Sequence, residues 1–319
     1  MRPTGKLHLG HLVGALESWV ELQDQYENFH LVADWHALTT AYDRTRNLRE
    51  NTHEMVIDWI SSGINPEKSP IFVQSHIPEH AELHLIFSML VTVARLERNP
   101  AVKEQAKQLN LEDKLSYGHL GYPVLQAADI LLYKGDLVPV GEDQVPHVEI
   151  AREIARRFNQ IYKTRVFPEP EPKLTEFKRL PGTDAQRMSK SLGNTILIAD
   201  PPDVISHKLR KAVTDPLKVR KGDPGRPDIC PIFTYHQKFD PETLQVAREG
   251  CESGRLGCLD HKMDLLKKIV EYLLPIWEKR RHYEAHPDEV MHIIADGDAR
   301  ARVIAQQTMA EVRSAMKLP

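Results

Sequence analysis

The chain has 319 residues, of which 41% are hydrophobic and 27% are charged, and its formal net charge at pH 7 is −3. These values describe an ordinary globular protein and exclude one whose whole surface is basic enough to bind nucleic acid. No apolar run has the length of a membrane span and the N-terminus lacks a signal-peptide core, so we expect a cytoplasmic protein without membrane contact. For this length we expect one large and one smaller domain.

The first predicted element is a helix that begins near His11, because apolar residues recur with helical spacing from Leu12 to Val20. The segment His8-Leu9-Gly10-His11 places two imidazoles and a glycine at its N-terminus. A helix N-terminus presents unpaired N–H groups, and Gly10 lets a ligand approach the backbone closely. The segment therefore suits a phosphate, although two histidines at the start of a surface helix are the simpler interpretation of this motif alone.

Strands and helices are predicted to alternate after this helix. Apolar runs at 29–34, 70–75 and 136–141 have the composition of buried parallel strands, and helical patterns occupy 46–61 and 79–95. This alternation predicts an α/β fold with a Rossmann-like, doubly wound parallel sheet. Ligands of such sheets bind beyond the carboxyl ends of the strands. The polar residues at the first two of these ends are Asp34, His36, Gln74 and Ser75.

Three histidines, His76, His80 and His84, recur every four residues around the start of the second helical pattern. A metal site is a weak interpretation, because no glutamate has the zinc-protease spacing and a proline interrupts the first turn. We expect an exposed polar face instead. The polar segment 97–120 is expected to move or to face a partner, and its Lys103 matters only if a phosphate lies nearby.

Asp129 is a lone carboxylate within an apolar helical pattern at 122–133. Burying a carboxylate without a partner is costly, so Asp129 is either a structural acceptor or a ligand contact. The segment Gly141-Glu142-Asp143-Gln144 turns from a predicted strand into a helix that runs to Phe158. This turn suits the hydroxyls of a ribose, and it also suits a helix N-cap with acids in the first turn.

A second candidate phosphate site is the segment Arg187-Met188-Ser189-Lys190-Ser191, which follows a loop with proline and glycine. Small hydroxyl residues around a lysine on such a loop predict a mobile cationic clamp. A lysine closed over a triphosphate would neutralise the charge that develops on the leaving pyrophosphate. An exposed loop is the simpler interpretation of this segment alone.

Together, His8-Leu9-Gly10-His11 and Met188-Ser189-Lys190-Ser191 resemble the two signature sequences of class I aminoacyl-tRNA synthetases. Five further segments narrow the resemblance to the bacterial-type tryptophanyl-tRNA synthetases and extend it over nearly the whole chain. They are Arg2-Pro3-Thr4-Gly5, Asp34-Trp35-His36-Ala37-Leu38-Thr39, Ala127-Ala128-Asp129-Ile130-Leu131, Val140-Gly141-Glu142-Asp143-Gln144 and the closing helix at 301–313.

The resemblance implies an enzyme that activates L-tryptophan with ATP and Mg²⁺, giving tryptophanyl-adenylate and pyrophosphate, and then transfers tryptophan to tRNA(Trp) with release of AMP. It implies a Rossmann-like catalytic domain over 1–190 and a helical anticodon-binding domain over 191–319. Helical patterns at 263–277 and 289–316 fit the second domain, and the last helix is expected to pack back on the first. A homodimer with an interface around 80–125 is also implied.

The resemblance assigns roles to individual residues as well. His8, His11 and Lys190 would be catalytic, with Lys190 stabilising the transferring phosphate. Tryptophan would be held by Gln144, His36 and Asp129, whose carboxylate is apt because an indole is only a donor and needs a fixed acceptor. ATP would be bound by Arg2, Pro3, Thr4, Gly10, His11, Gly141, Glu142, Asp143, Arg187, Met188, Ser189, Lys190, Ser191 and Lys103.

The three cysteines, Cys230, Cys251 and Cys258, are clustered and odd in number, which argues against a disulfide framework. Some tryptophanyl-tRNA synthetases carry a 4Fe-4S cluster on four cysteines in this region. The chain resembles that subgroup, with His261 in place of the fourth cysteine. Three states stay open: a 4Fe-4S cluster, a zinc ion on three cysteines and a histidine, and buried thiols without a metal.

Two features depart from the family pattern. Arg187 replaces the lysine that usually opens the second signature, which keeps the charge but changes the hydrogen-bond geometry. Met1 stands where the family has a strand just ahead of Arg2, so we expect that the chain is truncated or starts one strand late.

A basic stretch at 208–226 is expected to contact the tRNA backbone. Its basic residues are Lys208, Arg210, Lys211, Lys218, Arg220, Lys221 and Arg226.

Three rival functions stay open at this point. They are a tyrosyl-tRNA synthetase, which shares the motifs; a small-molecule adenylyltransferase of the same fold; and a synthetase-like protein that binds tryptophan or RNA for regulation. Amino-acid-dependent exchange between ATP and pyrophosphate separates them. Exchange with tyrosine alone would overturn the tryptophan assignment, and no exchange would favour the regulatory protein.

Overall fold

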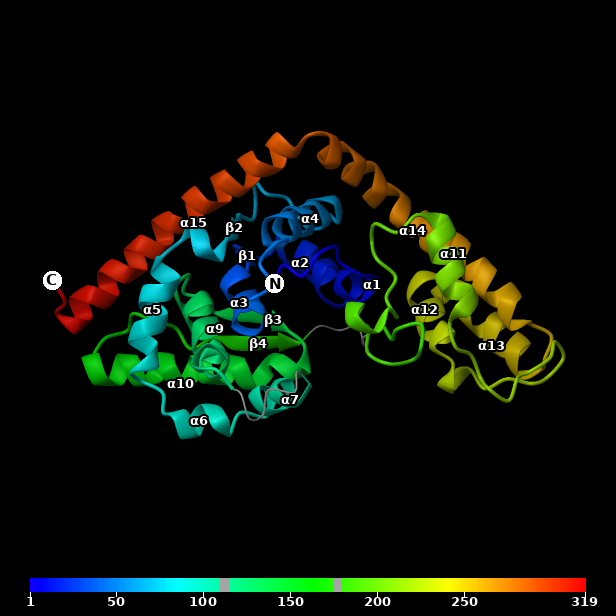
Figure 1. Cartoon of the computed structure of the whole chain (residues 1–319), viewed down its shortest axis with the longest axis horizontal. Helices are drawn as coiled ribbons and strands as arrows, with labels where there is room; N and C mark the ends of the chain where they lie inside the picture. The colour runs from blue at the N-terminus through cyan, green and yellow to red at the C-terminus, as the bar shows by residue number, and fades with distance from the viewer. Residues whose placement is uncertain (109–114, 175–179) are drawn as a thin grey trace.

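The computed structural model of the chain describes residues 1–108, 115–174 and 180–319, apart from the side chains of Gln105, Asp143 and Ser191. Residues up to 174 form an α/β part, and residues 202–285 form a helical part beside it (Figure 1). The last helix, α15 (Pro287–Met316), returns along the α/β part. None of the helices in the described ranges is long and apolar enough to cross a membrane.

The strands are parallel, as their apolar composition predicts. β1 (His30–Val32) pairs with β2 (Ile71–Val73), and β3 (Leu137–Val140) pairs with β4 (Glu171–Leu174). The α/β prediction with a Rossmann-like parallel sheet is confirmed. β4 was not predicted, because Pro172 interrupts its sequence and proline is tolerated only where no ladder hydrogen bond is needed. Met1 lies alongside β1, where its carbonyl accepts from the backbone of Ala33 at 2.8 Å.

The first helix begins at Leu9, two residues earlier than predicted, as α1 (Leu9–His11), continues as the π-helical turn η1 (Leu12–Leu16) and ends as α2 (Glu17–Leu22). The helix predicted at 46–61 is α4 (Leu48–Ser61), which follows α3 (Asp34–Ala41). π-turns in helices are frequent at functional sites.

The single helix predicted at 79–95 is wrong. The 3-10 turn η2 (Gln74–His76) leads to α5 (Glu79–Ser88), the chain breaks, and α6 (Val93–Glu97) begins at a new cap where the hydroxyl of Thr92 accepts from the backbone of Arg95 at 3.3 Å. The helices that follow in the α/β part are α7 (Pro100–Gln108), α8 (Tyr117–Leu120), α9 (Tyr122–Leu131) and α10 (Val145–Tyr162). Residues 109–114 of the predicted partner-facing segment lie outside the described residues.

The helical part contains the helices predicted at its end and several that were not predicted. Its elements are α11 (Pro202–Lys211), η5 (Pro227–Ile229), α12 (Pro231–Phe239), η6 (Pro241–Thr243), α13 (Leu244–Glu252) and α14 (Cys258–Ala285). One buried core joins the two parts, because Leu7 and Leu9 before and within α1 share it with Leu273 and Ile276 of α14.

The last helix, α15, packs directly on strand β2. The helix predicted at 289–316 was expected to pack on the first domain in this way. A Cβ at Gly297 would lie 1.9 Å from the carbonyl oxygen of Ile71, so only glycine allows this approach. Asp298 accepts from the backbone N–H of Val73 at 3.0 Å and bonds to His76 Nδ1 at 2.6 Å. The helix therefore holds the carboxyl end of β2, from which candidate site residues project.

Candidate active site

The first signature is held at a tight junction between distant segments. His8 forms an antiparallel bridge with Leu197, and the N–H of Leu9 donates to Ile196 at 2.9 Å. A Cβ on Gly10 would lie 3.0 Å from His8 Nδ1 and 3.1 Å from the sulfur of Met188. A side chain at this position would crowd His8 and Met188, so glycine suits it, and the structure brings the two signatures side by side.

The imidazoles of His8 and His11 stack with their ring centroids 3.7 Å apart. Burial, with the positive charge of Lys190 nearby, lowers the pKa of His8 to about 4. Burial and the neighbouring His8 lower that of His11 to about 3. Both rings are consequently neutral at pH 7. The backbone N–H of His8 donates to Nδ1 of His11 at 3.3 Å, which ties the two residues together at the start of α1.

Lys190 lies near His8 and His11 at the start of α1. It begins the 3-10 turn η4 (Lys190–Leu192), and its Nζ donates to the carbonyl of Thr4 at 2.8 Å. Burial lowers the pKa of this lysine. The loop is shaped by Asn194, which accepts from the backbone of Ser189 at 2.8 Å and donates to the carbonyl of Arg187 at 3.0 Å. Lys190 is thus presented beside His8 and His11 by a hydrogen-bonded loop.

Asp129 is the acceptor for three buried side chains. Gln74 Nε2 donates to it at 2.7 Å, and the rings of His36 and His80 bond to it at 2.9 and 2.7 Å. Burial alone would raise the pKa of Asp129, but the charges and hydrogen bonds of His36 and His80 outweigh burial and hold it below the usual range. A carboxylate offers about four lone-pair positions, so one position remains for a further donor.

Gln74 is one of the polar residues predicted at the carboxyl end of a strand, whereas His80 was not assigned to the site from the sequence. The prediction that His76, His80 and His84 form an exposed face is wrong for His80, which is 0% exposed and also bonds to the hydroxyl of Tyr133 at 2.8 Å. The helical phase carried the signal, because His80 shares the buried face of α5 with Leu83 and Phe87.

The remaining predicted residues belong to two other segments of the α/β part, the turn after β3 and helix α7. Gly141 follows β3 and leads into the 3-10 turn η3 (Glu142–Gln144), so the predicted ribose turn sits at the carboxyl end of a strand. The side chain of Asp143 lies outside the described part of the chain. Lys103 is exposed on α7, and Glu142 is exposed on η3.

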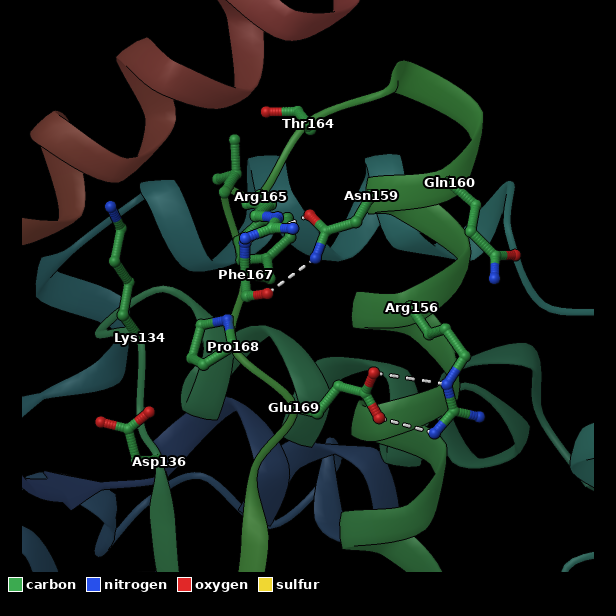
Figure 2. Close-up of a pocket in the computed structure, with 11 residues that line it drawn as sticks. Lys134, Asp136, Arg156, Asn159, Gln160, Thr164, Arg165, Phe167, Pro168 and Glu169 are labelled. Atoms are coloured by element: carbon green, nitrogen blue, oxygen red, sulfur yellow. Dashed lines mark hydrogen bonds and ion pairs between the residues drawn. The ribbon is translucent and has the colours of Figure 1, made fainter.

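A surface pocket of about 750 Å³ lies at the opposite end of β3 (Figure 2). Arg156 and Glu169 form an ion pair across it at 2.6 Å, and Asn159 donates to the carbonyl of Phe167 at 2.7 Å. None of the residues predicted to bind ATP or tryptophan lines this pocket. The candidate chemistry therefore belongs to the clusters around Lys190 and Asp129.

The cysteines and His261 line one small pocket of the helical part. The thiols are free, and burial raises the pKa of Cys230 and of Cys251. Nε2 of His261 bonds to His236 Nδ1 at 2.7 Å. Within the described ranges, no three metal-binding side chains stand close enough to hold an ion. The four predicted ligands are thus neighbours, without forming a ligand set as they lie.

The basic stretch at 208–226 is less available than its composition suggests. Lys218 is buried and donates to the carbonyl of Cys251 at 2.9 Å, so the prediction of a backbone contact is wrong for this residue. Lys208, Lys221 and Arg226 pair with carboxylates at 2.6 to 3.1 Å. The basic residues of the stretch that are exposed and outside these pairs are Arg210, Lys211 and Arg220.

Comparison with known proteins agrees with this arrangement of fold and site. The family model of the class I tRNA synthetases for W and Y matches residues 1–274, and the chain belongs to this family. Its curated relatives include the tryptophan–tRNA ligase of Thermotoga maritima, 53% identical over 100% of this chain and 98% of the relative, and that of Aquifex aeolicus, 43% identical over 100% and 98%.

A solved structure gives the same result. The tryptophanyl-tRNA synthetase of Campylobacter jejuni, complexed with ADP and tryptophan, has a TM-score of 0.88 and 32% identity over 100% of this chain and 98% of its own. The resemblance inferred from the two signatures is therefore confirmed at the level of the family.

Proposed function

We propose that this chain activates L-tryptophan with ATP and transfers it to tRNA(Trp). The observation that carries the proposal is the buried carboxylate of Asp129, which holds three donors and retains a position for an indole N–H. The curated relatives named above are tryptophan–tRNA ligases, which supports the same substrate.

In the first step, a carboxylate oxygen of tryptophan attacks the α-phosphorus of ATP, and the bond from that phosphorus to the bridging oxygen of the β-phosphate breaks. Pyrophosphate leaves with the bonding electrons. Mg²⁺, when bound to ATP, neutralises part of the phosphate charge. Lys190 supplies a cation beside the N-terminus of α1, where His8 and His11 are neutral donors to phosphate oxygens.

In the second step, a hydroxyl of the terminal tRNA ribose attacks the tryptophanyl carbonyl, the ester bond forms, and AMP leaves. The bond between the carbonyl carbon and the phosphate oxygen of AMP breaks, and the proton of the attacking hydroxyl is released. Neither step needs a protein nucleophile, so positioning and electrostatics supply the acceleration. We place the ribose of ATP at Gly141, Glu142 and Asp143, and we place Gln144 and His36 beside the tryptophan.

The other proposed ATP contacts surround Lys190. Arg2, Pro3 and Thr4 precede the first signature, and Thr4 already bonds to Lys190. Arg187, Met188, Ser189 and Ser191 belong to the loop of the second signature. Lys103, exposed on α7, would reach a phosphate only if α7 moved toward the site. These roles extend the family resemblance residue by residue.

Exchange of labelled pyrophosphate into ATP tests the proposed function. We expect exchange that depends on tryptophan and not on tyrosine, and tryptophan-dependent charging of tRNA(Trp) in the cytoplasmic fraction. Exchange with tyrosine alone would make the chain a tyrosyl enzyme. Binding of tryptophan without exchange would indicate a regulatory protein.

Residues 191–319 are proposed to form the anticodon-binding domain. Arg210, Lys211 and Arg220 are exposed there and provide charge for a phosphate backbone. The domain is joined to the first signature through the shared core of α14. Binding of tRNA(Trp) would therefore engage a domain whose core is continuous with that of the catalytic part.

We propose a homodimer that uses the segment around 80–125. Large apolar side chains are exposed on α5, at its C-terminal end, and on α6 and α8, and an exposed apolar patch is typical of a protein–protein interface. They are Leu85, Met89, Val93 and Tyr117, which are 56% to 69% exposed.

Replacing Met89 by glutamate is expected to convert the dimer to a monomer, because a charge would be buried in an apolar interface. Sedimentation equilibrium measures the change. Val246→Glu on α13, where Val246 is 72% exposed, is the matched control and should stay dimeric. A Met89→Glu protein with the mass of a dimer would contradict this interface.

We propose that the cysteine pocket holds a 4Fe-4S cluster, with zinc or no metal as the alternatives. The donors fit in kind, since thiolates and an imidazole bind iron or zinc, and all four side chains line the same pocket. Because Nε2 of His261 is bonded to His236, a metal would take Nδ1. The ammonium of Lys218, 3.9 Å from the sulfur of Cys251, would offset the charge of the thiolates.

Protein purified without oxygen is expected to absorb broadly at the violet edge of the visible spectrum and to contain iron. Cys251→Ser should lose both the absorption and the iron, because a ligand is removed. Elemental analysis that found zinc and no absorption would assign the zinc site. If the wild-type protein contained neither metal, the pocket would hold three free thiols, two of them buried.

A further inference from the structure

The backbone of the first signature is bonded on both sides just ahead of His8. The N–H of Leu7 donates to Oδ2 of Asp58 on α4 at 2.7 Å. The carbonyl of Leu7 accepts from the backbone N–H of Ile198 at 2.9 Å. These two bonds fix the peptide that presents His8, so whatever holds Asp58 and Ile198 also sets the position of that imidazole.

Helix α14 of the helical part holds both of these partners. Nη1 of Arg280 bonds to Oδ1 of Asp58, and its Nη2 bonds to Glu54. Nε1 of Trp277 donates to the carbonyl of Ile198 at 2.7 Å. Trp277 and Arg280 are three residues apart and therefore lie on one face of the helix.

The ion pair between Arg280 and Asp58 is buried. Asp58 is 0% exposed and Arg280 is 3% exposed, and Glu284 of α14 is a third acid, 3.0 Å from Nε of Arg280. A buried ion pair of this kind has few alternative arrangements, since losing either partner leaves a charge uncompensated. The guanidinium thus fixes the direction in which the Asp58 carboxylate faces Leu7.

We propose that Arg280 and Trp277 are positioning residues for ATP, acting on the first signature through Asp58 and Ile198. This inference rests on the proposed binding of ATP at His8 and Gly10. Neither residue touches the substrate in this scheme. Their effect is to hold the Leu7–His8 peptide where the imidazole and the N-terminus of α1 meet the phosphates, and they place this control on the helix of the proposed anticodon-binding domain.

Steady-state exchange kinetics with both substrates test the proposal. Arg280→Met is expected to raise the KM for ATP about tenfold and to leave the KM for tryptophan within about twofold, because only the ATP half of the site is released. Trp277→Phe, which keeps the packing and removes one donor, should shift the KM for ATP in the same direction by about threefold. Lys279→Met, an exposed neighbour on α14, should change neither constant.

The variant Ile276→Ala distinguishes the positioning role from a purely structural one, because it opens a cavity in the core beside the same helix and removes none of these hydrogen bonds. If Arg280→Met raises the KM for ATP no more than Ile276→Ala does, or raises both KM values equally, the positioning role is wrong. Should Arg280→Met not fold, Trp277→Phe and Arg280→Lys carry the test, since lysine cannot span Asp58 and Glu54 together. His8→Ala in the same assay tests the premise: an unchanged KM for ATP there would refute ATP binding at this motif itself.

Discussion

Replacing Lys190 by alanine is expected to lower kcat for tryptophan-dependent pyrophosphate exchange by about 10²- to 10³-fold, the usual effect of removing one preorganised charge donor. Its ammonium is the cation that the loop presents beside His8 and His11, and the charge on pyrophosphate grows as the bond to phosphorus breaks. Thermal stability should change little, because the side chain bonds only to the exposed Thr4 among the described residues. Exchange assays at saturating ATP measure the loss.

Leu192→Ala is the matched control, because Leu192 lies in the same turn and is 63% exposed. It should retain the wild-type kcat. A Lys190→Ala enzyme with normal kcat and a raised KM for ATP would contradict the role in the transition state, since that pattern indicates ground-state binding alone.

The second large effect is expected at Asp129. Asp129→Asn should raise the KM for tryptophan by about 10- to 100-fold, because an amide NH₂ now faces donors and each buried group left unpaired costs about 1–3 kcal/mol. The melting temperature should fall as well, since Gln74, His36 and His80 all lose part of their acceptor. The KM for ATP should stay near its wild-type value.

The pH dependence of stability gives a second readout for Asp129. Its folded pKa lies below the ordinary value, so the paired carboxylate stabilises the fold above that ordinary value, and this contribution is lost as pH falls toward the folded pKa. Asp129→Asn lacks this part of the acid response. Asp136→Asn, an exposed carboxylate before β3, is the control. Equal KM values for tryptophan in the two variants would remove Asp129 from the substrate site.

Local pattern was sufficient for three of the four described strands and for the helices α4, α9, α10, α14 and α15. Apolar runs closed by polar residues identified β1, β2 and β3, because buried parallel strands have few alternatives in composition. β4 was missed because Pro172 argues against a strand, and the pairing with β3 became visible only in the structure. The break between α5 and α6 was missed because apolar spacing continued through it.

The sequence alone determined the two signatures proposed to bind phosphate, the candidate carboxylate Asp129 and, through them, the family. These features are local: a histidine pair before a helix, a lysine among small hydroxyl residues, and a lone acid in an apolar helix each carry their chemistry within a few residues. The two signatures lie side by side, since a Cβ on Gly10 would be 3.1 Å from the sulfur of Met188.

Only the tertiary structure decided what surrounds those features. It turned His80 inward onto Asp129, joined Gln74 to the same carboxylate, and set His261 against His236. It also brought Arg280 from the far end of the chain to Asp58, and thereby to the backbone that presents His8. Hydrogen bonds between residues far apart in sequence cannot be predicted from hydrophobic periodicity. Each partner fits the pattern of its own helix or strand whether or not the other partner is present.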